Sequence, residues 1–87
     1  MTEESILEFP CDVPIKVFGR NTPEFRATVL SIVRKYWEDL PETRVSERLS
    51  RSDTYLSLTI TVYAESRAQI DAAYHSLTAS GQVLMML

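Results

Sequence analysis

A strict two-residue alternation of apolar and polar side chains over residues 55–64 constrains the fold of this chain more than any other feature. Because neighbouring side chains of a strand point to opposite sides of a sheet, the segment predicts a strand with one buried and one open face. The side chains of the other face are Tyr, Ser or Thr. β-branched and aromatic residues dominate the segment, which suits a central strand. The apolar series is Leu56, Leu58, Ile60, Val62 and Ala64.

The rest of the chain supplies three further strands and two helices. Apolar spacing, capping residues and turn residues define each of them. The second strand is short and charged, which is typical of a sheet edge, and its Val45 and Leu49 are expected to face the core. The predicted strands besides the central one are Val13–Gly19, Glu42–Ser50 and Gln82–Leu87, and the predicted helices run from the Thr22 cap to Pro41 and from the Ser66 cap to Gly81.

The element order predicts the fold class. Strand, helix, strand, strand, helix, strand with short connections is the order of the α+β ferredoxin-like βαββαβ sandwich. In that fold two helices cover one face of a four-stranded antiparallel sheet and leave the other face open. We expect one domain over residues 13–87, preceded by a flexible N-terminal segment over residues 1–12.

The last predicted strand is apolar on both faces. In the predicted phase, residues 83, 85 and 87 serve the core, and their neighbours join the aromatic residues of the open face. A lone domain of this size gains stability from association, so we expect this face to mediate self-association or to hold a protein partner. Alternatively, Ile6, Leu7 and Phe9 of the N-terminal segment cover it. The predicted interface consists of Phe18, Tyr55, Tyr63, Leu84 and Met86.

Composition excludes several classes of function. Twelve acidic and nine basic residues give a formal net charge of −3, which argues against general binding to nucleic acids or anionic membranes. Cys11 is the only cysteine, so an internal disulfide or a multi-thiolate metal site is impossible, and His75 stands alone. The acidic N-terminus has no signal-peptide pattern. We expect a cytoplasmic protein without a metal or another cofactor.

Short motifs spread over nearly the whole chain point to a family. They are Leu7-Glu8-Phe9-Pro10, Lys16-Val17-Phe18-Gly19, Phe25 with Val29, Ile32 and Val33, the series Tyr55, Ser57 and Thr59, Gln69 with Tyr74 and Leu77, and the terminal Val83–Leu87. In their order and spacing these motifs resemble the small bacterial YbeD-like family, whose function is uncharacterised. The resemblance implies a ferredoxin-like fold similar to the ACT regulatory domains. ACT domains bind small ligands near the loop after the first strand, often at a dimer interface.

By that resemblance the candidate ligand-binding residues are Gly19, Arg20, Asn21 and Thr22. Their loop runs into a helix N-terminus, whose free N–H groups favour an anion or a carboxylate. We predict a regulatory or protein-interaction module that binds a small anionic or amino-acid-like metabolite, a protein partner, or both. In the alternative interpretation, Gly19 only permits a turn, Thr22 only caps the helix, and Arg20 is solvated.

Two other functions stay open as alternatives. Val17-Phe18-Gly19-Arg20 followed by Phe25-Arg26 faintly resembles the phosphate loop of acylphosphatases, but the inner glycine of that loop and the water-orienting asparagine are missing. A sheet-face binder of single-stranded RNA lacks the expected glycine-aromatic-basic signature on its third strand. We therefore expect a binding module rather than an enzyme. An RNA-binding face would use Phe18, Tyr55 and Tyr63 with Lys16, Arg44 and Arg48.

Overall fold

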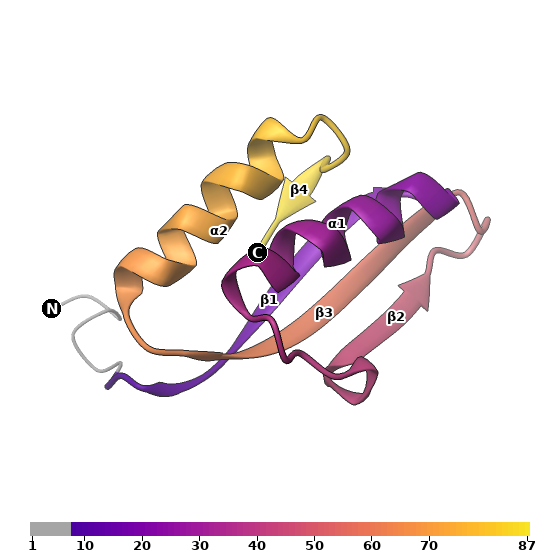
Figure 1. The fold of residues 1–87 in the computed structure, drawn as a ribbon. Helices are drawn as coiled ribbons and strands as arrows, with labels where there is room; N and C mark the ends of the chain where they lie inside the picture. Colours follow the sequence, from indigo (N-terminus) through magenta and orange to yellow (C-terminus); the bar gives the residue numbers. More distant parts are fainter. Residues whose placement is uncertain (1–7) are drawn as a thin grey trace, which may run out of the picture.

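A four-stranded antiparallel sheet carries the fold. The computed structural model describes residues 8–87, and its strand order is β2-β3-β1-β4. Both helices lie on one face of the sheet (Figure 1). The elements are β1 (Cys11–Arg20), α1 (Pro23–Tyr36), the 3-10 helix η2 (Glu42–Arg44), β2 (Val45–Leu49), β3 (Tyr55–Ala64), α2 (Arg67–Ala79) and β4 (Met85–Met86). This arrangement confirms the predicted ferredoxin-like βαββαβ sandwich.

The predicted alternation of β3 is confirmed. β1 and β3 pair over their whole lengths, from Cys11 opposite Ala64 to Arg20 opposite Tyr55. Directly opposite residues of an antiparallel pair share a face, so residues 17 and 58 meet beneath the helices, where both are fully buried. Every apolar residue of the β3 series is buried, whereas Tyr55 and Tyr63 are exposed. The core therefore lies between this pair of strands and the two helices.

The N-terminal boundary of the sheet lies two residues earlier than predicted. Cys11 and Asp12, expected in a flexible segment, pair with Ala64 and Tyr63. Phe9 is half-buried and packs against the core, so it does not cover the open face. The remainder of the predicted lead-in, residues 1–7, lies outside the described residues.

Both helices begin at the predicted caps. Thr22 Oγ1 accepts a hydrogen bond from the Phe25 N–H at 3.1 Å, and Ser66 Oγ accepts one from the Gln69 N–H at 3.2 Å. The Gln69 side-chain oxygen in turn accepts from the N–H of the residue before the cap, at 2.8 Å. Gly81 follows the second helix with a φ of 79°, in the left-handed region that glycine adopts without strain. Local sequence signals therefore place the helix starts correctly.

Helix α1 ends earlier than predicted, at Tyr36 rather than at Pro41. Trp37 leaves the helical conformation (φ −135°, ψ 82°), and its indole N–H donates a hydrogen bond to the main-chain oxygen of Tyr63 at 3.0 Å. Leu40, in the loop that follows α1, is buried in the hydrophobic core. A tertiary contact made by one side chain therefore replaces the last turn of the predicted helix.

The second predicted strand is also shorter than expected. Residues 42–44 form η2, and only Val45–Leu49 form β2, which lies at the sheet edge as predicted. Val45 is half-buried against the core, as expected. Leu49 was expected in the core as well, but it is 49% exposed although it pairs with the buried Leu56. β2 is an edge strand and lies to one side of α1 (Figure 1).

The C-terminal strand has the opposite phase to the predicted one. Met86 lies opposite Val17 and packs against the core, whereas Met85 lies opposite Phe18 on the open face. Met85 and Leu87, both expected in the core, are 56% and 66% exposed. The sequence could not fix this phase, because residues 83–87 are apolar throughout and contain no alternation.

Candidate functional site

Gly19 of the predicted ligand loop has a packing role. A Cβ atom at this position would lie 2.2 Å from the Phe25 ring and 2.8 Å from the main-chain oxygen of Gln82. Only glycine lets the first residue of α1's buried face and the segment before β4 approach the strand this closely. The glycine is therefore required by the core, whatever else the loop binds.

The polar groups of the same loop have partners inside the chain. The Arg20 guanidinium lies over the Tyr55 ring, 5.9 Å from its centroid. The Asn21 amide donates to the main-chain oxygen of Asp53 at 3.0 Å, and Thr22 caps α1. These contacts join the loop to the turn between β2 and β3. A ligand-binding role of residues 19–22 stays a prediction, and each of these side chains has a structural role without a ligand.

Arg26, the residue that gave the faint acylphosphatase resemblance, is held by two carboxylates. Its guanidinium pairs with Glu47 and, at 2.8 Å, with Glu42, which also pairs with Arg34 at 3.2 Å. The hydrogen bonds to Glu47 and Glu42 raise the pKa of Arg26, and those from Arg26 and Arg34 lower the pKa of Glu42. This cluster links η2 and β2 to α1, and its charges are already compensated.

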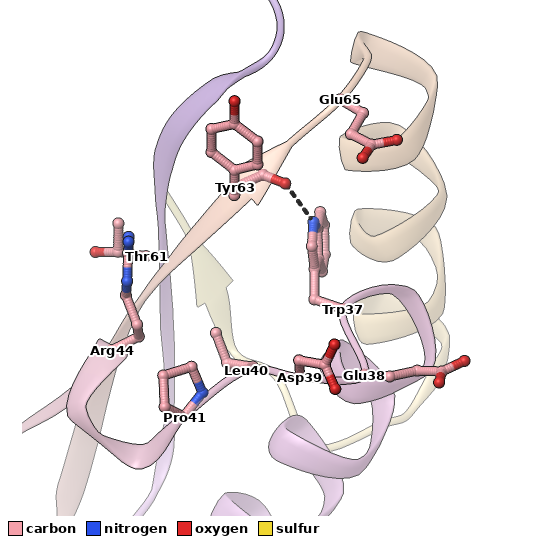
Figure 2. A pocket seen from close by; sticks show the side chains of 9 residues that line it. All are labelled: Trp37, Glu38, Asp39, Leu40, Pro41, Arg44, Thr61, Tyr63 and Glu65. Carbon is pink, nitrogen blue, oxygen red and sulfur yellow. Dashed lines mark hydrogen bonds between the residues drawn. The ribbon is translucent and has the colours of Figure 1, made fainter.

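A concave surface lies beside Trp37. We call it the Trp37 cavity (Figure 2); its volume is about 330 Å³. Apolar side chains, two aromatic rings and charged groups of both signs line it. The lining residues are Trp37, Glu38, Asp39, Leu40, Pro41, Arg44, Thr61, Tyr63 and Glu65.

The cavity exists because β2 is shorter than β3. The ladder between the two strands ends where Val45 meets Ile60, and β3 continues to Ala64 without β2 beside it. Along a strand, alternate main-chain carbonyls point to the same edge, and the Trp37 indole bonds one of those on the edge that β2 leaves. The segment from Trp37 to Pro41 therefore stands beside β3 in place of a strand, with a hollow between them.

Charged groups surround the hollow on different sides. Figure 2 shows Arg44 beside Thr61, on the side of the cavity opposite Glu65, with the Trp37 and Tyr63 rings between them. Arg44 pairs with Asp12 at 3.2 Å, and both side chains of this pair are exposed. An exposed pair of this kind is weak, so the guanidinium can exchange its partner for another carboxylate. The cavity thus offers a cation at one side and a carboxylate at the other.

The helix predicted to run to Pro41 includes Trp37, Glu38 and Asp39. The adjacent acidic pair is unfavourable at the C-terminal end of a helix. Together with Pro41, that pair is the one local signal that the helix stops early and that its last predicted turn has another use.

The predicted interface residues divide between two ends of the open face. Phe18 and Tyr55 line one depression near the β2–β3 turn, whereas Tyr63 lies eight residues further along β3, about 26 Å away at the usual rise of a strand. Leu84 is 61% exposed before β4. Met86 lies on the core side, so it does not belong to this surface, and Met85 takes its place.

Within residues 8–87, no group of His, Cys, Asp and Glu side chains is placed to hold a metal ion. Cys11 is half-buried, and His75 is exposed on α2. No helix of the described chain is long and apolar enough to cross a bilayer.

Comparison with known proteins identifies the family. Residues 4–87 match the model of a family described as protein of unknown function (DUF493). The chain belongs to this family. Its full-length relatives include UPF0250 protein NE1487 of Nitrosomonas europaea, which is 47% identical over the whole of both chains. A UPF0250 protein of Paraburkholderia phytofirmans is 43% identical over 97% of this chain and 94% of its own. The resemblance to the YbeD-like family is thereby confirmed, and the family description names no activity.

A solved structure confirms the fold independently. The solution structure of protein HP0495 from H. pylori superposes with a TM-score of 0.73, covering all of this chain and 94% of the other. The two sequences are 14% identical. At that identity the likeness establishes the shared fold and says nothing of a shared ligand.

Proposed function

We propose that this protein is a regulatory binding module whose ligand is a small zwitterionic, amino-acid-like metabolite held in the Trp37 cavity. The observation that carries the proposal is the placement of aromatic walls between a guanidinium and carboxylates. The cavity volume falls at the lower end of the range for small-molecule sites, which suits a compact ligand.

The wall residues suggest how each part of such a ligand binds. Arg44 would take the carboxylate of the ligand, because a guanidinium binds a carboxylate through two parallel hydrogen bonds. Glu65 would take the ammonium group from the other side. The apolar part would lie between Trp37 and Tyr63, whose ring faces also attract a cationic group.

A ligand in this position would connect three parts of the chain. Trp37 belongs to the loop after α1, Arg44 to η2, and Tyr63 to β3. Binding across the three would stabilise the native state of a small domain and restrain the loop between α1 and β2. Such coupling of ligand to loop order is the physical basis for the regulatory role.

Trp37 is the only tryptophan of the chain and therefore reports on the cavity directly. We would titrate the full-length protein with individual amino acids and follow the fluorescence of Trp37. The expected result is saturable quenching or enhancement by at least one of them, with affinity weakened about tenfold or more in Arg44→Ala and in Glu65→Gln.

The matched control is Arg51→Ala, which removes an exposed arginine from the β2–β3 turn far from the cavity. This variant should bind as the wild type does. The proposal fails if no amino acid changes the emission below about 10 mM, or if Arg44→Ala and Arg51→Ala bind equally well.

A further inference from the structure

A second depression lies on the open sheet face, at the end of β3 away from the Trp37 cavity. We call it the Arg48 depression; its volume is about 200 Å³, and its walls include Phe18, Arg48, Ser50, Tyr55 and Ser57. The strand register explains its position, because residues 48, 57, 18 and 85 form one row across the four strands. Along this row a cationic side chain is followed by a hydroxyl side chain and then by two apolar side chains.

The charge of this face is unbalanced. Lys16, Arg20 and Arg48 all lie on the strands, and none of them forms an ion pair recorded among residues 8–87. The strands contain only two acidic residues, Asp12 and Glu47. Asp12 is paired with Arg44 at the distant end, and Glu47 is paired with Arg26 of α1, on the helix side. A chain with a net charge of −3 thus presents uncompensated cations on one surface.

Apolar side chains continue the same surface toward β4. Phe18 is half-buried in the row, and Met85 beside it is 56% exposed. Leu87, two residues beyond Met85, is 66% exposed. Neighbouring exposed apolar residues on a small domain mark a contact surface.

We propose that the open face docks an extended acidic segment of another protein. A carboxylate side chain of that segment enters the Arg48 depression, where it forms ion pairs with Arg48 and Arg20. The apolar side chain two residues along the segment packs on Phe18 and Met85, since alternate residues of an extended chain share a face. Exposed residues at the β4 edge extend the apolar contact.

Two other occupants fit the surface less well. A second copy of this chain, packed face to face about a twofold axis through the Arg48 depression, would place the same cations opposite one another. A single-stranded nucleic acid needs a cationic footprint along its whole path, which a net charge of −3 opposes. Nucleic acids also stack on aromatic rings, whereas the β4 end of this surface is aliphatic.

The test uses the full-length protein and a fluorescein-labelled, end-capped peptide of alternating Glu and Phe. Anisotropy should show saturable binding below about 1 mM that weakens as salt is added. Arg48→Glu should weaken the binding about tenfold or more. The matched control is Lys35→Glu, which makes the same charge change at an exposed position of α1 and should stay within about twofold of the wild type.

Amide chemical shifts locate the peptide independently. Residues of the row at Phe18, Ser57 and Met85 should shift, and the Trp37 indole signal should not. If Arg48→Glu does not melt cooperatively, Arg20→Gln replaces it and should also weaken binding.

Four outcomes would each overturn the proposal. The first two are the absence of binding below about 1 mM and equal losses of affinity in Arg48→Glu and Lys35→Glu. The other two are equal binding of an alternating Lys-Phe peptide and tighter binding of a labelled oligouridylate than of the acidic peptide.

Discussion

The regions at the two ends of β3 differ in construction and in charge. At the Arg48 depression four strands lie in register, and the surface is a nearly flat row of side chains with uncompensated cations. At the Trp37 cavity β2 has ended, a loop stands beside β3, and carboxylates outnumber cations on the wall. The comparison teaches that one sheet provides a flat docking surface where its strands are paired and a hollow where an edge strand stops short.

Both ends depend on the same core, so Leu58→Ala should weaken them together. Leu58 is fully buried at the centre of β3, and its truncation should lower the free energy of unfolding by about 2–5 kcal/mol. Urea denaturation measures the loss. Ser57→Ala, one residue away on the open face, should cost within about 0.5 kcal/mol. Similar midpoints for the two variants would show that the buried face of β3 is wrongly assigned.

Gly19→Ala should damage the Arg48 end selectively. The added Cβ meets the Phe25 ring and the main chain at Gln82, so the segment before β4 must shift, at a cost of about 1–3 kcal/mol. Amide shifts around Phe18 and Met85 should change, while the emission of Trp37 stays as in the wild type. A wild-type melting temperature would contradict the close packing.

Trp37→Phe should damage the opposite end. The variant removes the hydrogen bond to the Tyr63 carbonyl and should cost about 1 kcal/mol, with some further loss of packing. Hydrogen exchange should accelerate at the end of β3 near Ala64 and remain unchanged near Tyr55. Equal acceleration at both positions would mean that the two ends of the strand are not independent.

The smallest expected effect is a pH dependence confined to the Trp37 end. The pKa of Glu42 is lowered by Arg26 and Arg34, so its contribution to stability is present at neutral pH and is lost as the pH falls through that lowered pKa. Because Glu42 belongs to η2, acid should change the Trp37 emission before it changes the circular dichroism of the sheet. In Glu42→Gln the early change should be absent; its persistence would assign it to another group.

Most of the fold could be predicted because it depends on local patterns. The alternation of β3 fixes its buried face, and the caps at Thr22 and Ser66 fix where the helices begin. The phase of β4 could not be predicted, because main-chain contacts with β1 decide it. One of these is the hydrogen bond from the Leu84 N–H to the Phe18 oxygen at 2.8 Å.

The candidate sites were only partly predictable, because they too depend on contacts between segments that are distant in the sequence. Phe18 and Tyr55 follow from strand periodicity, and both line the Arg48 depression as members of the predicted open face. The Trp37 cavity depends on where α1 and β2 stop, and a contact between residues 37 and 63 decides the first of these. No pattern within either segment encodes that contact, so the cavity becomes visible only in three dimensions.

The hydrogen bond between Trp37 and Tyr63 also bears on edge-to-edge pairing between molecules. A strand that extends beyond its neighbour leaves unpaired main-chain groups. These groups can pair with a strand of another molecule, which is the usual start of β-aggregation. Here a bulky indole occupies one of those groups and obstructs the approach of a foreign strand. Along the rest of this edge of the sheet, the exposed strand is β2. It is short and carries Glu47 and Arg48, charges that discourage the same kind of pairing.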